Sequence, residues 1–157
     1  MSYTESRRCL LFACRALKRG HYRRAAGRYA QVVTGLQPQT VTTRLLALED
    51  VPLVRHYAAA CRGWAAALAG LAHPDDAETV LLAALGKLRR FISNLGVPAG
   101  SRALLLAEYK RCFYALAEVY TTHELPERLA AYVRQHGTEL ETWRRDLNLL
   151  AAAHHLN

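Results

Sequence analysis

Arginine is the residue type with the strongest capacity for specific chemistry in this 157-residue chain, and it is concentrated near the start. Up to residue 28, eight basic residues stand against one acid, whereas the rest of the chain has 13 basic and 12 acidic residues. The first 28 residues therefore carry +7 of the formal net charge of +8. Because the chain has eighteen arginines and three lysines, this segment favours bidentate binding of carboxylates or phosphates. The eight residues are Arg7, Arg8, Arg15, Lys18, Arg19, Arg23, Arg24 and Arg28.

Residues typical of catalysis and metal binding are scattered. The four cysteines form no C-x-x-C pair, so we expect reduced, mostly buried thiols rather than a zinc site, with a reactive Cys14 as the alternative. His154 and His155 are adjacent, and adjacent helical residues point to different faces. We find no glycine-rich phosphate loop and no strand–turn–helix context for a nucleophile. The expectation is that the chain is not an enzyme and holds no metal or cofactor.

Helix-forming residues dominate the chain, and apolar residues recur at helical spacing. A first helix is predicted from about Glu5 to Lys18, and a second from about His21 to Leu36. The short turn at Gly20 requires that they pack antiparallel. Pro38 is predicted to end this hairpin.

Further helices are predicted over the remainder of the chain. A short helix over Thr40–Leu48 is ambiguous, and a longer one covers about Pro52–Leu71. Asp75 and Glu78 indicate a capping box, Asn94–Gly96 a left-handed cap, and Ser101 a further helix start. Gly137 is predicted to separate the last two helices. The predicted fold is all-α, with about seven or eight helices packed as antiparallel hairpins, either a repeat-like array or a compact bundle, in one domain over residues 1–157.

The first hairpin resembles a tetratricopeptide repeat. Phe12 and Ala13 supply the large–small pair of that family's first helix. Its second helix is matched by Gly20, Tyr22, Ala25, Tyr29 and Val32. The closing proline is one residue late, and Cys9 stands where an aromatic residue is usual. Two weaker matches to the same pattern follow later in the chain. Their small residues Ala65 and Ala117 continue from Ala13 at intervals of 52 residues, a spacing that is not the family's own.

This resemblance implies a concave groove lined by the first helix of each hairpin. Leu10 and Cys14 replace the lysine and asparagine with which the family's best-known groove grips a peptide carboxylate, so that ligand class is not expected. An acidic helix or extended peptide fits better. The implied groove residues are Arg7, Leu10, Cys14, Lys18, Arg62, Arg111, Tyr114 and Glu118.

We expect a non-enzymatic adaptor whose basic hairpin binds a protein with an acidic segment. Nucleic acid is the main alternative, but no aromatic residue is predicted on the exposed side of the arginines to stack on bases. An obligate subunit is a further alternative, with an apolar interface at Trp64, Tyr114 or the last helix. The oligomeric state is left open.

The segment Val133–Glu141 also resembles the death-motif helix of the Bcl-2 family, a family of eight-helix apoptosis regulators. The aspartate of that motif is Thr138 here, and the Asn-Trp-Gly-Arg signature is missing. No window of 18 uninterrupted apolar residues and no secretory signal is present, so we expect no membrane insertion and a cytoplasmic or nuclear location.

Overall fold

The computed structural model describes residues 1–41 and 51–154, with side chains for residues 1–37 and 51–146. These residues form six helices and no strand, so the all-α prediction is confirmed and the count of seven or eight was wrong. Most of the predicted short helix Thr40–Leu48, and His155, lie outside the described residues. The helices are α1 (Tyr3–Lys18), α2 (Tyr22–Val41), α3 (Val51–Gly70), α4 (Pro74–Ser93), α5 (Ala99–Thr122) and α6 (Pro126–His154).

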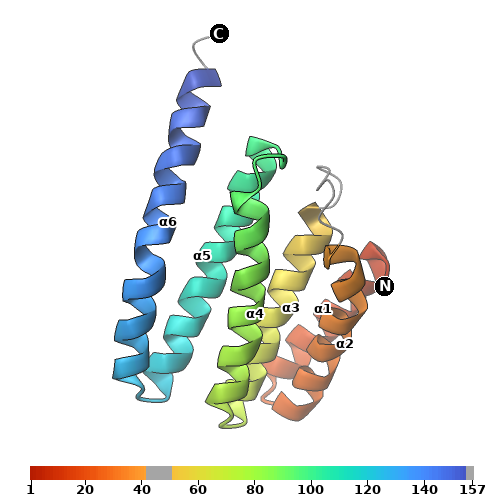
Figure 1. Ribbon diagram of the computed structural model, residues 1–157. Helices are drawn as coiled ribbons and strands as arrows, with labels where there is room; N and C mark the ends of the chain where they lie inside the picture. The colour runs from red at the N-terminus through yellow and green to blue at the C-terminus, as the bar shows by residue number, and fades with distance from the viewer. Residues whose placement is uncertain (42–50, 155–157) are drawn as a thin grey trace.

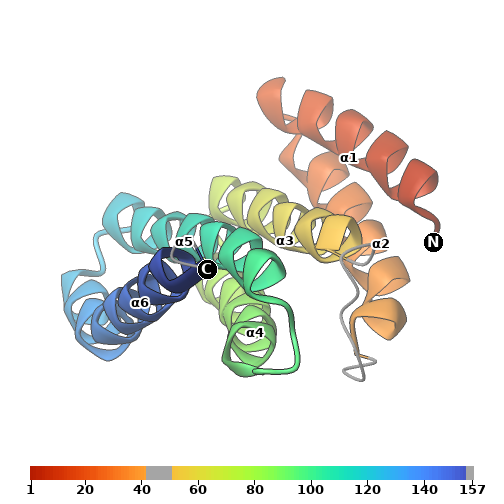
Figure 2. The same cartoon turned by 90° about the horizontal axis from the view of Figure 1, so that it is seen from above.

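The helices are arranged as three antiparallel hairpins that stack side by side (Figure 1). Seen from above, α1, α3 and α5 lie along one side of the stack, and α2, α4 and α6 along the other (Figure 2). Each helix contacts the next in sequence, and α3 also contacts α1 and α5. Of the predicted repeat-like array, the structure confirms that the chain is helical and that its six helices pack against their neighbours.

The three hairpins follow a common period of 52 residues. The first helix of each pair ends at Lys18, Gly70 or Thr122, and the second helix starts at Tyr22, Pro74 or Pro126. Both series advance by 52 residues. The positions of the three anchoring alanines predicted from the sequence therefore correspond to one another in the folded chain.

The turns within the hairpins repeat with the same period. Each contains one residue with positive φ, which is 73° at Gly20, 62° at Ala72 and 54° at Glu124. Each also contains a backbone bond that satisfies a free carbonyl at the end of the first helix. These bonds run from His21 N to Ala16 O (2.9 Å), from His73 N to Leu68 O (3.0 Å) and from Leu125 N to Tyr120 O (2.8 Å).

Two helix boundaries differ from prediction because one unfavourable residue does not outweigh its surroundings. α6 runs through Gly137 without a break, since an interior glycine costs only about 1 kcal/mol relative to alanine. Leu129, Tyr132, Leu140 and Trp143 hold this helix against the core. α2 continues through Pro38 to Val41, and the proline costs the last turn one backbone hydrogen bond.

The predicted cap residues have other partners. α4 begins at Pro74, with His73 as its N-cap and no side-chain cap bond. Glu78 instead accepts hydrogen bonds from Tyr120 Oη (2.7 Å) and Arg128 Nη1 (2.8 Å), and so joins α4 to α5 and α6. Asn94 has a φ of −82°, which is not left-handed. α5 starts before Ser101, whose side chain is fully buried.

Candidate partner-binding site

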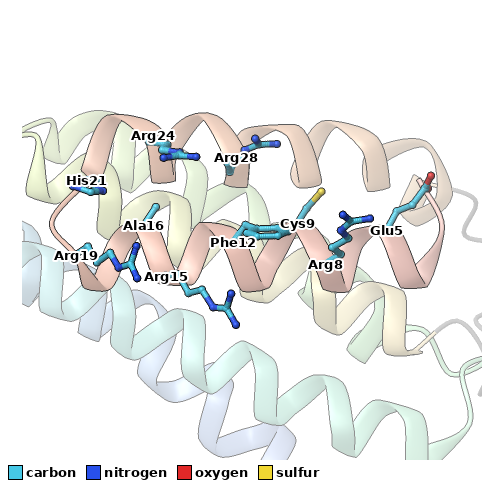
Figure 3. A pocket seen from close by; sticks show the side chains of 10 residues that line it. All are labelled: Glu5, Arg8, Cys9, Phe12, Arg15, Ala16, Arg19, His21, Arg24 and Arg28. Carbon is cyan, nitrogen blue, oxygen red and sulfur yellow. The ribbon is translucent and has the colours of Figure 1, made fainter.

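A groove of about 640 Å³ runs between α1 and α2 on the outer side of the first hairpin (Figure 3). We call it the N-terminal groove. From α1 it is lined by residues at the spacing of one helix face, and from α2 by two arginines one turn apart. Its lining residues are Glu5, Arg8, Cys9, Phe12, Arg15, Ala16, Arg19, His21, Arg24 and Arg28.

The charge of this groove is strongly positive. Five of its lining residues are arginines, and none of the five forms an ion pair among the described residues. Its one acid, Glu5, closes a capping box with Ser2: the Ser2 N–H donates to Glu5 Oε2 (2.7 Å), and the Glu5 N–H donates to Ser2 Oγ (3.2 Å). These bonds lower the pKa of the Glu5 carboxyl, so it stays ionised at the positive end of the helix dipole.

Phe12, the large member of the large–small pair on the first helix, has a side chain that is 50% exposed. Its ring lies in the N-terminal groove, with the guanidinium carbon of Arg8 6.0 Å from the ring centroid. The apolar stripe of α1 is shared between the core, which takes Ala13, and the groove, which Cys9 and Phe12 line, while the buried Ala16 borders both. The prediction that no exposed aromatic residue interleaves with the arginines was therefore wrong.

The structure gathers the predicted basic residues only in part. Arg8, Arg15, Arg19, Arg24 and Arg28 line the groove together. Arg7, Lys18 and Arg23 are exposed on the first hairpin without lining it, and Leu10 is partly buried against the core. Tyr114 is 64% exposed on α5, a separate part of the stack.

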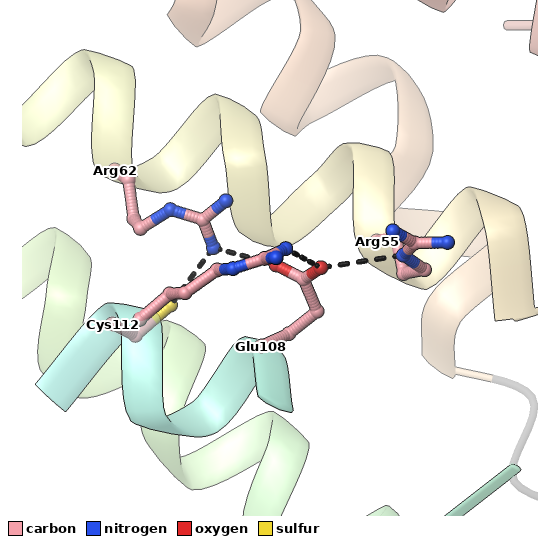
Figure 4. A network of polar contacts seen from close by, with 5 residues as sticks. Arg55, Arg62, Glu108 and Cys112 are labelled. Carbon is pink, nitrogen blue, oxygen red and sulfur yellow. Dashed lines mark hydrogen bonds and ion pairs between the residues drawn. The ribbon is translucent and has the colours of Figure 1, made fainter. Parts of the chain in front are cut away.

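Arg62 and Arg111 meet at a carboxylate that the sequence analysis missed. Glu108 on α5 is buried to 2% exposure. It accepts hydrogen bonds from Arg62 Nη1 (2.8 Å) and Arg111 Nη1 (2.7 Å), and also from Arg55 Nε (3.2 Å) (Figure 4). Arg55 and Arg62 are seven residues apart on α3, which places them on one helix face and was the available signal.

A second, smaller cavity of about 270 Å³ lies over these residues, lined also by Tyr3 and His56. His56 Nδ1 lies 2.8 Å from Ser6 Oγ, and its ring stacks on Tyr3 at 4.5 Å between centroids. Burial and the nearby Arg55 and Arg7 lower the pKa of His56. These contacts join α1 to α3, and the network around Glu108 joins α3 to α5.

The surroundings of the two buried cysteines disfavour a reactive thiol. Burial raises the pKa of Cys61 to about 12 and also raises that of Cys112, which disfavours the thiolate. Cys9 and Cys14 are partly buried and unpaired by disulfides. Among the side chains of residues 1–37 and 51–146 we find no cluster of three or more His, Cys, Asp or Glu residues able to hold a metal ion.

No helix in the described part of the chain is long and apolar enough to cross a membrane. No protein-family model, curated protein or solved structure matches the chain.

Proposed function

We propose that this protein is a non-enzymatic adaptor that binds an acidic segment of another protein in the N-terminal groove. The supporting observation is the grouping of five arginines without acidic partners around a half-exposed phenylalanine. Guanidinium groups attract and orient carboxylates, and Phe12 offers apolar area that a partner buries after the charged encounter.

The exposed ring of Phe12 also supports a second candidate, a single-stranded nucleic acid. Proteins that bind single strands stack successive bases on several aromatic side chains along a basic groove. The N-terminal groove contains one such ring, and the remainder of its α1 wall is formed by Glu5, Cys9, Ala16 and arginines. An acidic protein segment therefore fits this lining better than a polynucleotide does.

Charge reversal combined with nuclease treatment tests the proposal. The tagged chain is used to capture partners from an extract of the cells that express it, with and without nuclease. The double variant Arg15→Glu/Arg19→Glu reverses two groove charges. Arg134→Glu/Arg145→Glu is the matched control, because both arginines are exposed on α6 and form no ion pair with any other described side chain.

We expect an acidic protein that survives nuclease and the control substitutions but is lost with the groove variant. Loss on nuclease alone would assign the groove to nucleic acid. Equal loss with both variants would mean that only net charge matters, and would contradict a defined site in the groove.

A further inference from the structure

The period of 52 residues relates the outer face of α1 to a buried face of α3. Arg8, Leu11 and Arg15 occupy the positions that α3 fills with Ala60, Gly63 and Ala67. α2 packs on that face of α3, since the rings of Tyr29 and Tyr22 lie against the backbone at Gly63 and Gly70. Ala60 and Ala67 are accordingly fully buried.

The third hairpin repeats this arrangement. Cys112 and Val119 on α5 stand at the positions of Arg8 and Arg15, and their exposures are 0% and 5%. α4 from the preceding hairpin packs against α5, and Tyr120 donates a hydrogen bond to Glu78 across that contact. In both later hairpins, the positions that correspond to Arg8 and Arg15 are therefore buried, and the second helix of the preceding hairpin packs against the first helix that carries them.

On α1 the same positions are uncovered among the described residues, and α1 lies at one edge of the stack (Figure 2). Leu11 and Phe12 are 55% and 50% exposed there. Leu116 stands at the third-hairpin position that corresponds to Phe12, and it is fully buried. The first hairpin thus presents a helix-packing face with its apolar centre open to solvent.

The charges around that face define what fits on it. Arg8 and Arg15 replace the small residues of α3, and Arg24 and Arg28 form the opposite wall of the groove. A helix lying there needs an apolar stripe for Leu11 and Phe12 and carboxylates along its flanks. α6 of a second copy lacks the excess of carboxylates that this face requires, because it carries four basic and four acidic residues.

We propose, on the basis of the adaptor function above, that the acidic segment bound in the N-terminal groove is an amphipathic α-helix of a partner protein. It packs against α1 as α2 packs on α3 and as α4 packs on α5. Its apolar stripe covers Phe12 and Leu11, and its acidic residues pair with the flanking arginines of α1, Arg8 and Arg15.

Peptide binding tests this assignment. The first peptide is a fluorescent 20-residue helix, the length of α2, with leucines at i, i+3, i+4 and i+7 spacing and glutamates on both flanks. A second peptide has the same composition with the leucine spacing shuffled. A third keeps the spacing and replaces every glutamate with glutamine. Binding is followed by fluorescence anisotropy, with Arg134→Glu/Arg145→Glu as the matched control for Arg8→Glu/Arg15→Glu.

We expect the amphipathic acidic helix to bind at least about tenfold more tightly than either other peptide, a difference of about 1.4 kcal/mol. Only Arg8→Glu/Arg15→Glu should abolish that preference. Equal affinity for the shuffled peptide would overturn the helical partner and leave the acidic partner intact. Equal affinity for the glutamine peptide would overturn the acidic partner itself.

Two further outcomes would also overturn the assignment. One is the absence of binding by all three peptides. The other is sedimentation of the free chain as a concentration-dependent head-to-tail assembly that Phe12→Ser dissolves, since this face would then be occupied by a second copy of the chain.

Discussion

The ring of Tyr29 on α2 lies directly against the backbone of Gly63 on α3, so that a Cβ atom at Gly63 would come within 2.2 Å of the ring carbon Cζ. The same relationship recurs one heptad later, where a Cβ at Gly70 would lie 2.6 Å from Tyr22 Cδ1. Two aromatic rings on one helix therefore pack on two glycines of the next. The first two hairpins approach closely because these positions have no side chain.

Gly63→Ala is therefore expected to destabilise the fold. The added methyl group overlaps the Tyr29 ring, and overpacking of this kind costs about 1–3 kcal/mol. Gly86→Ala is the matched control, because nothing lies within 4 Å of a Cβ at that helical position and alanine favours the helix by about 1 kcal/mol. Denaturant unfolding should show a lower midpoint for the first variant and an unchanged or higher midpoint for the second. A neutral Gly63→Ala would contradict the close packing of α2 on α3.

Glu108→Ala removes the acceptor shared by Arg55, Arg62 and Arg111. Breaking a buried ion pair costs about 3–5 kcal/mol, and we expect the lower end because the Arg55 and Arg111 side chains are 49% and 57% exposed and regain water. Glu141→Ala is the comparison, since Glu141 and its partner Arg144 are 52% and 53% exposed on α6, and loss of this surface pair should leave the midpoint unchanged. Similar midpoints for the two variants would mean that Glu108 does not hold α3 to α5.

The burial of His136 makes the stability of the fold depend on pH in the mildly acidic range. Its side chain is buried on α6, with Nδ1 3.0 Å from Arg89 Nη2 and 3.3 Å from Tyr109 Oη. Burial and Arg89 lower its pKa in the folded state. The unfolded chain then binds more protons below the ordinary histidine pKa of about 6.5, so stability falls as the pH falls through that value.

Unfolding free energies at pH 7.5 and 5.5 test this dependence. The loss between the two values should shrink in His136→Gln and, separately, in His56→Gln, because the pKa of His56 is lowered as well. The exposed His21→Gln is the control and should keep the full loss. An unchanged pH dependence in both His136→Gln and His56→Gln would rule out these two histidines as its origin.

The sequence allowed the prediction of much of this architecture. The ends of α1 and α3 fall within two residues of expectation, because the Gly20 turn and the apolar periodicity act locally. The continuity of α6 through Gly137 could not be anticipated, since tertiary packing decides it. The 52-residue spacing of Ala13, Ala65 and Ala117 was visible in the sequence. That this spacing corresponds to three hairpins depends on turns at Ala72 and Glu124, and alanine and glutamate do not indicate turns.

The candidate site was only partly predictable for a related reason. Clustering of arginines is a property of the sequence and was recognised. Which of them share a groove depends on how α1 and α2 are rotated about their axes, and this rotation also exposes Phe12. The meeting of Arg55 with Glu108 joins residues 53 positions apart, which local periodicity does not reveal.

Photo-crosslinking from within the groove tests the central claim most directly. A photoreactive phenylalanine analogue replaces Phe12 in one sample, and in the control it replaces Val133, which is 46% exposed on α6. Irradiation in cell extract should join an acidic protein to position 12 and not to position 133, and Arg15→Glu/Arg19→Glu should abolish the adduct. An adduct that nuclease removes, or one formed equally from both positions, would contradict a protein-docking site in the N-terminal groove.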